Sequence, residues 1–126
     1  MSFTIDRIFF FLGSLLGFSG VVAGAFGAHF LKDRLTPDML AVFETGARYH
    51  LLHALALLAC AWAAFQYSHP LIRSAGWLFL AGTIVFSGSL YLLAWTGIKM
   101  WGAITPIGGL LLLAGWLSLA IGVFKR

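Results

Sequence analysis

The sequence predicts an all-α integral membrane protein: a four-transmembrane-helix bundle with glycine-rich helix packing. Its composition and the arrangement of its apolar runs lead to this fold class. Of its 126 residues, 61% are hydrophobic and 10% are charged, and the mean hydropathy is +0.97. A soluble domain is usually about 45–50% apolar and about 25% charged. We therefore expect lipid, rather than water, to surround most of the folded chain.

Four apolar runs account for most of the sequence. They cover residues 8–28, 47–65, 74–98 and 100–124, and only the second contains a charge, at Arg48 near its start. A helix needs about 20 apolar residues to cross a bilayer, and backbone in hydrocarbon must be helical to satisfy its hydrogen bonds. We therefore predict a single transmembrane domain, 1–126, with spans at about 8–29, 47–66, 72–96 and 106–124.

The first run contains a regular row of glycines. Its members, at intervals of four and three, are Gly13, Gly17, Gly20, Gly24 and Gly27. An average interval of 3.5 residues places them on one stripe of a helix. Small residues let membrane helices approach closely, so we predict a packing seam, with a groove for a flat ligand or lipid tail as the alternative. The fourth run has a shorter row of the same kind: Gly108, Gly115 and Gly122. The first run is also too long for a typical signal-peptide core, so we expect it to be retained.

Helix-start signals precede the second and third runs, and one lies inside the fourth. Thr36, Pro37 and Asp38 supply an N-cap, a proline at the first position and an acid in the first turn, which predicts a second helix over 37–66. At 1.5 Å per residue this helix exceeds a bilayer core of about 30 Å, so residues 37–46 are expected to protrude or lie in the interface. Thr105-Pro106 predicts the start of the fourth helix, and His69-Pro70 is a weaker signal of the same type.

Ionisable residues inside a membrane are candidates for function. If Gln66 marks the cytoplasmic boundary, His50 lies roughly 5 Å and His53 roughly 9 Å below the outer interface. At 100° per residue, Tyr49 shares a face with these two histidines, and His29 ends the first helix on the same outer side. We predict one outer polar cluster, hydrogen-bonded and without metal, formed by His29, Tyr49, His50, His53, Ser87, Tyr91 and Thr105.

Two other polar features are assigned simpler roles. Glu44 and Arg48 lie on the opposite face of the second helix and are predicted to form an interfacial ion pair. The His50–His53 spacing could present two nitrogens to a metal, but no carboxylate or thiolate completes a zinc or di-iron set. We therefore expect no metal and no cofactor. The sequence has one cysteine. Most of its five tryptophans fall where an aromatic belt would lie.

The basic residues bear on orientation and partners. They are scattered singly, which excludes a nucleic-acid stripe. Lysine and arginine are nearly equal on the two sides of the four spans, and we predict both termini in the cytoplasm. The side with the termini carries Arg7, Arg73, Lys125 and Arg126, and the other side carries Lys32, Arg34, Arg48 and Lys99.

Four motifs together resemble one known family. They are GAFGAH at 24–29, FETGARYHLLHALALL at 43–58, FSGSLYLLA at 86–94 and TPIGGLLLLAGW at 105–116. In order and spacing they resemble the small four-span membrane family called domain of unknown function 423, with bacterial inner-membrane and mitochondrial members. The resemblance implies an integral protein of the bacterial inner membrane and names no reaction. The residues that match the family pattern are His29, Tyr49, His53, Ser87, Gly88, Tyr91, Pro106, Gly108, Gly109 and Trp116.

Three functions remain open at this point. The favoured one is a structural, interaction or assembly protein, which needs no catalytic group and suits glycine seams. Its partners would be the bilayer and either further copies of the chain or another membrane protein. A carrier or channel for protons or a small solute is the second possibility, although its ionisable groups would be expected near the midplane. A membrane redox, metal or haem protein that uses the outer histidines is the third.

Overall fold

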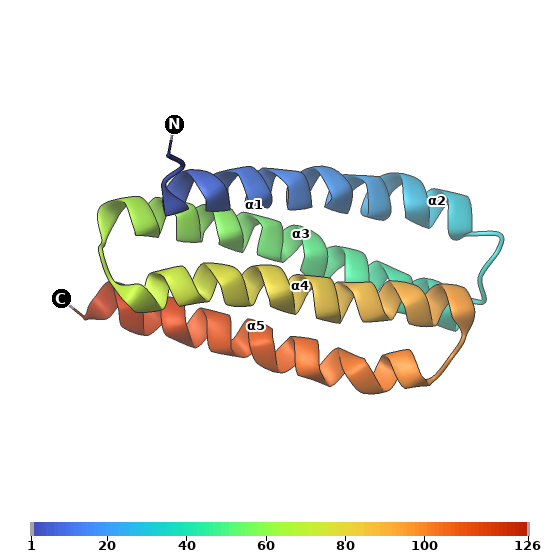
Figure 1. The fold of residues 1–126 in the computed structure, drawn as a ribbon. Coiled ribbons are helices and arrows are strands. Elements are labelled where there is room, and N and C mark those ends of the chain that lie inside the picture. Colours follow the sequence, from blue (N-terminus) through green and yellow to red (C-terminus); the bar gives the residue numbers. More distant parts are fainter. Residues whose placement is uncertain (1, 126) are drawn as a thin grey trace.

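The computed structural model describes residues 2–125 and contains four long helical rods (Figure 1). The first rod joins α1 (Ile5–Val21), a π-helical segment η1 (Val22–Gly27) and α2 (Ala28–Leu31). The others are α3 (Pro37–Gln66), α4 (Pro70–Thr96) and α5 (Met100–Phe124). All four are long and apolar enough to cross a membrane, so the predicted fold class is confirmed.

The four rods pack in the order α1, α3, α4, α5. The most extensive contacts join α1 to α3, α3 to α4 and α4 to α5, while α1 touches α4 only lightly. The two central helices are therefore more buried than the two edge helices, α1 and α5. Both chain termini lie at one end with the α3–α4 turn, which we call the terminal end (Figure 1). The opposite end, with the 32–36 and 97–99 connections, is the loop end.

Two predicted helix starts are confirmed and one is wrong. The Thr36 hydroxyl accepts a bond from Met39 N–H at 3.2 Å at the start of α3, and His69 Nδ1 accepts one from Leu71 N–H at the start of α4. Pro106, however, lies inside α5, which already begins at Met100. The Thr105 hydroxyl bonds Trp101 O in the preceding turn instead of capping a helix. Pro106 is the seventh residue of α5, so its missing N–H leaves a backbone carbonyl of the preceding turn without its helical partner. Transmembrane helices tolerate such a proline because neighbouring groups satisfy the freed backbone.

The π-helical segment was not predicted. It includes Gly24 and Gly27 of the glycine row, and the N–H of Ala28 after it bonds the carbonyl of Ala23, five residues back. Such wide turns insert one residue into a helix and are frequent at functional sites. Here the wide turn lies in the loop-end part of the first rod, beside α3.

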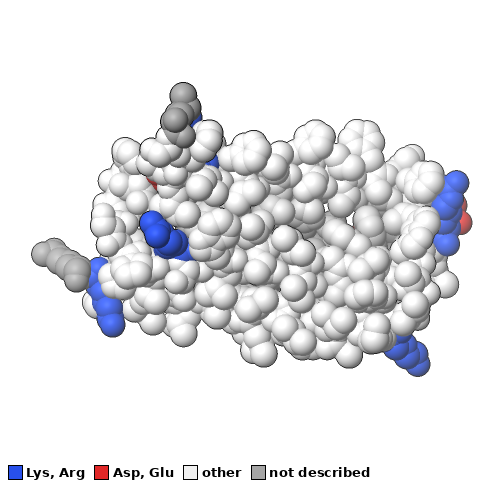
Figure 2. All heavy atoms as spheres, in the orientation of Figure 1, with Lys and Arg blue, Asp and Glu red and all other residues white. Residues whose placement is uncertain are grey.

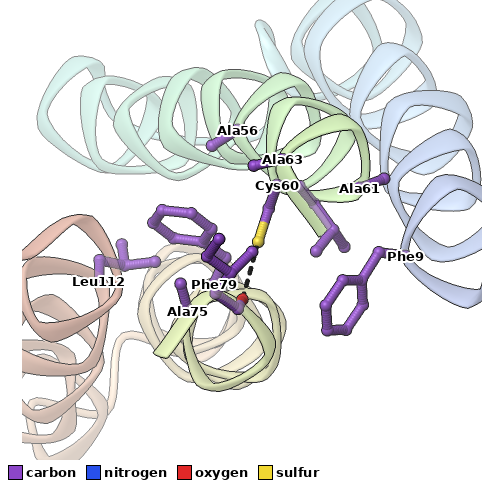
Figure 3. Packing of buried hydrophobic residues seen from close by; sticks show 10 residues of the cluster. Phe9, Ala56, Cys60, Ala61, Ala63, Ala75, Phe79 and Leu112 are labelled. Carbon is purple, nitrogen blue, oxygen red and sulfur yellow. Dashed lines mark hydrogen bonds between the residues drawn. The ribbon is translucent and has the colours of Figure 1, made fainter. Parts of the chain in front are cut away.

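The core at the terminal end is almost entirely apolar. Its large fully buried side chains come from α1, α3 and α4: Phe9, Leu57, Cys60, Ile72 and Phe79. Figure 3 shows Phe9 from α1 and Leu112 from α5 closing this core on opposite sides. The only hydrogen bond drawn in it is donated by Cys60 Sγ to the carbonyl of Ile72 at 3.1 Å.

The glycine rows mark where the edge helices approach the central ones. A Cβ added to Gly13 or Gly20 would meet a leucine of α3, Leu58 at 2.9 Å or Leu51 at 2.7 Å. The prediction fails at Gly17, where an added Cβ would meet nothing within 4 Å. On a regular helix Gly17 lies about 40° from Gly13, at the edge of the stripe. The α5 row faces α4: Gly108 lies against the Phe86 backbone, Gly115 against Phe79 and Gly122 against Ile72.

On the face drawn in Figure 2, charged side chains lie only at the ends of the molecule. Figure 2 shows lysine and arginine at both ends of one face and an uncharged surface between them. This distribution is that of a multi-pass membrane protein, whose apolar middle faces lipid. The exposed large apolar side chains of all four rods are therefore lipid-facing surface.

Candidate functional site

From the middle of the bundle toward the loop end there is a set of hydrogen bonds between helices, which we call the polar layer. It consists of five bonds, and each joins two different helices. Its members are Ser19, Gly46, His50, His53, Ser87, Ser89, Tyr91, Thr105 and Trp116. The layer is the largest concentration of polar groups inside the bundle and is therefore the candidate site.

His50 lies at the centre of the layer and connects three helices. Its Nε2 is 3.0 Å from Ser19 Oγ of α1, and its Nδ1 is 2.9 Å from the Tyr91 hydroxyl of α4. The Ser19 hydroxyl donates to Leu15 O in its own helix at 2.9 Å, so it accepts from Nε2–H of His50. Tyr91 then donates to Nδ1. This arrangement holds a neutral imidazole with both nitrogens engaged.

His53 is held by a second pair of bonds. Its ring is 2% exposed. The Trp116 indole, which can only donate, bonds His53 Nε2 at 3.0 Å, and Nδ1 of the same ring donates to Tyr49 O at 2.8 Å. His53 is therefore the neutral tautomer that carries its proton on Nδ1. Since Trp116 belongs to α5, this bond joins α3 to a helix against which it hardly packs otherwise.

Hydroxyl groups of α4 complete the polar layer. Ser87 Oγ donates to Gly46 O of α3 at 2.7 Å, and the bond is buried. Ser89 Oγ lies 2.6 Å from Thr105 Oγ1 of α5. Within residues 2–125, no buried side-chain nitrogen or oxygen lacks a hydrogen-bond partner. Each interior polar group thus avoids the cost of being left unsatisfied in hydrocarbon.

The structure does not place His29 in the cluster predicted for it. His29 is exposed, whereas Leu31 of the same short helix is buried against Phe43. Two residues along a helix are about 200° apart, so His29 faces away from α3 when Leu31 faces toward it. Depth alone suggested a shared layer, but the direction around the helix decides the contact. The Tyr49 side chain also lies outside the bonded set: it is 39% exposed and stacks on His53 and Phe86.

The predicted Glu44–Arg48 ion pair is not formed. Both side chains are exposed and, among the residues that the structure describes, no contact within 4.0 Å joins their charged groups. They line a shallow groove of about 530 Å³ beside Gly24 and Ala28. An exposed pair one turn apart gains only about 0.3–0.5 kcal/mol, which side-chain entropy readily offsets.

The three histidines of the possible metal site do not converge. Nowhere in residues 2–125 do three His, Cys, Asp or Glu side chains gather closely enough to hold a metal ion. The ring nitrogens of His50 and His53 are directed to different partners on different helices. Beside His53, a lipid-facing groove of about 560 Å³ between α3 and α5 is lined by Tyr49, Pro106 and Trp116 among others.

Comparison with known proteins identifies the family. Residues 23–109 match the family model "Protein of unknown function (DUF423)". The chain belongs to this family. This DUF423 chain is 45% identical over 119 residues to a UPF0382 membrane protein of Staphylococcus saprophyticus, covering 94% of the chain and 98% of the relative. It is 40% identical over 120 residues to the UPF0382 membrane protein YwdK of Bacillus subtilis, with 94% and 98% covered. No solved structure matches it.

Sequence reasoning missed three side chains of the polar layer in this DUF423 chain, besides the backbone carbonyl of Gly46. Trp116 was considered only among the five tryptophans, most of which were expected in an aromatic belt, yet its indole bonds His53 in the bundle. Ser19 and Ser89 were not included in the cluster, although each bonds another helix. Trp116 does occur in the pattern of the family resemblance, which was a usable signal. Ser19 could have been found from its position one residue before the seam glycine Gly20.

Proposed function

We propose that this protein is a structural or interaction helix bundle, of the assembly type, in the bacterial plasma membrane. The observation that carries the proposal is that, within residues 2–125, each buried polar side chain has a hydrogen-bond partner, and five of these bonds join helices. Both ring nitrogens of His50 and both of His53 are engaged in hydrogen bonds to neighbouring helices or to the backbone, so neither imidazole has a nitrogen free for a substrate or a metal.

The direction of the polar bonds supports this proposal over a carrier or channel. The chain from Ser19 through His50 to Tyr91 runs from helix to helix, across the bundle and not along it. Toward the terminal end it meets the apolar core that contains Phe9, Cys60 and Phe79. A proton or solute path would need polar groups continuing through that region.

Co-purification tests the proposal directly. The full-length protein is extracted from native membranes in polymer discs, and proteins, metals and the visible spectrum of the sample are measured. We expect a stoichiometric protein partner or a defined homo-oligomer, and no change in stability when zinc or a chelator is added. A haem Soret band, a stoichiometric metal or a chelator-induced loss of stability would instead support the redox alternative.

The proposed orientation places both termini in the cytoplasm. The position of both termini at one end of the bundle supports a shared side of the membrane (Figure 1). Arg7, Arg73 and Lys125, which belong to the same end, support the cytoplasm as that side. Reporter fusions after Phe30 and after the C-terminus are expected to give opposite signals, with the C-terminal fusion active in the cytoplasm. Equal signals would contradict the four-span topology, and reversed signals would invert the orientation.

A further inference from the structure

Two grooves flank the turn between α3 and α4 at the terminal end. The larger one, about 960 Å³, lies between this turn and the end of α5. Its walls include Trp116, Leu119 and Phe124, and Lys125 lies at its rim. The smaller one, about 380 Å³, lies on the other side of the turn, and Arg73 is among its lining residues. Both grooves share the turn residues Tyr67, Ser68 and His69.

The turn is polar and the larger groove below it is apolar. Gln66, Tyr67 and Ser68 are exposed, and no hydrogen bond of their side chains to the described chain is formed. The groove wall extends from Phe124 back to Trp116, eight residues or about 12 Å along α5. A ligand that fits has a polar head on the turn and a hydrocarbon chain against α5.

The charged residues that line the two grooves indicate which kind of ligand headgroup they would bind. Each groove contributes one cation, Lys125 or Arg73, and neither is lined by aspartate or glutamate. Asp6, in the first turn of α1, is the acid of this end and lines neither groove. Basic pockets between membrane helices bind anionic lipid headgroups, and each nearby cation strengthens such binding.

We propose that the 66–69 turn with its two grooves binds one anionic phospholipid. The phosphate lies on the turn between Lys125 and Arg73, and an acyl chain lies in the larger groove along α5. Tyr67 and Ser68 donate hydrogen bonds to the phosphate oxygens. The headgroup residues are independent of the polar layer and of the proposed function, because none of them takes part in a bond between helices; the far end of the groove wall, Trp116, also bonds His53.

Native mass spectrometry of the full-length protein tests this site. The protein is released from discs that contain equal amounts of phosphatidylglycerol and phosphatidylcholine, and the retained lipid is counted. We expect one phosphatidylglycerol, enriched roughly 25-fold over phosphatidylcholine, which is about fivefold for each of the two cations. Arg73→Gln with Lys125→Gln should reduce the enrichment by roughly fivefold for each cation removed. Lys32→Gln with Lys99→Gln, the matched change at the loop end, should leave it unchanged.

Two further arms separate the lipid from other occupants. Ala120→Trp fills the larger groove without changing charge and should also reduce retention of phosphatidylglycerol. Inorganic phosphate should give no thermal protection, because it lacks the chain that the groove holds. Equal retention of the two lipids, or equal losses in the two charge variants, would overturn the proposal. So would a dimer that Ala120→Trp dissociates, since the groove would then hold a second copy.

Discussion

The two halves of the bundle hold their helices together in different ways. At the terminal end, Phe9, Phe79 and their neighbours fill the space between helices with apolar side chains (Figure 3). From the middle of the bundle toward the loop end, the polar layer joins the helices through hydrogen bonds with defined donors and acceptors. Apolar contact sets the distance between two helices but tolerates sliding, whereas a hydrogen bond fixes one atom of each helix against the other.

The difference shows how a small membrane protein can specify one arrangement. Lipid tails are as apolar as the side chains in the core, so burial by itself gives little drive for association. Close approach at glycines supplies van der Waals contact, and the polar layer supplies directional bonds. The comparison predicts that disrupting close approach costs more than removing any single hydrogen bond.

The largest loss is expected from Gly108→Ala. An added Cβ would overlap the backbone of Phe86, which cannot move as a flexible side chain does. We expect a loss of about 3 kcal/mol in the free energy of unfolding in detergent, at the upper end of overpacking costs. The control is Gly17→Ala, whose Cβ meets open space, and which should be neutral or stabilising by up to about 1 kcal/mol. Similar losses for both variants would show that close approach is not what matters.

Phe9→Ala should be next in size. Phe9 is fully buried, with its ring against Gly76 and edge-on to Trp77 at 5.2 Å. In a soluble core this change costs about 3–5 kcal/mol, but part of that is transfer from water. Because the exposed state of this side chain is in lipid and not in water, we expect a smaller loss, of about 2 kcal/mol in the free energy of unfolding. Phe10→Ala, at a side chain that is 58% exposed, should have little effect on the same unfolding curve. If Phe9→Ala were as stable as Phe10→Ala, the apolar core at the terminal end would not contribute measurably to stability, and the comparison would fail.

Tyr91→Phe removes one hydroxyl of the polar layer without changing shape. His50 Nδ1 then loses its donor, so we expect a loss of about 1–2 kcal/mol. The matched change is Tyr49→Phe, because the Tyr49 hydroxyl has no hydrogen bond to the described chain and its ring is partly exposed. A double-mutant cycle with His50→Ala should show that the two positions are coupled. Additive losses would mean that the His50–Tyr91 bond contributes nothing specific.

The smallest effect is expected at the bond between α3 and α5. Trp116 is 44% exposed to lipid, so Trp116→Phe removes its donor to His53 Nε2 while keeping much of the apolar surface. We expect about 0.6 kcal/mol, the average for such bonds in a membrane. Trp62→Phe, at an outward-facing position that is 60% exposed, serves as the comparison in thermal unfolding. A larger loss than that of Tyr91→Phe would reverse the order proposed here.

The sequence predicted the helices well because hydropathy and caps act locally. Thr36 and His69 mark helix starts whose donors and acceptors lie within three residues. The predicted helix start at Pro106 was wrong because a proline in the first or second turn of a helix looks the same in sequence as a proline at its first position. The π-helical segment has no such local signature, since several arrangements of glycine and alanine accept either geometry.

The candidate site was predicted less completely because its bonds depend on direction around each helix. Phase within one helix correctly grouped His50 with His53 and separated them from Glu44. It could not say which residue of another helix would face them, so Trp116 and Ser19 were missed and His29 was wrongly included. Partner choice is a property of how helices cross, which a single sequence does not contain.

The serial order of the helices has a consequence for biosynthesis. The rods α1 and α3 can enter the bilayer as one hairpin, and α4 and α5 as another, because each pair is adjacent in sequence and in space. In the first hairpin alone, His50 has Ser19 but lacks Tyr91, and His53 lacks Trp116. A nascent chain that stops after residue 66 therefore exposes two half-satisfied imidazoles to lipid. We expect such a chain to be held by the insertion machinery or degraded, which makes arrival of the second hairpin a checkpoint in its synthesis.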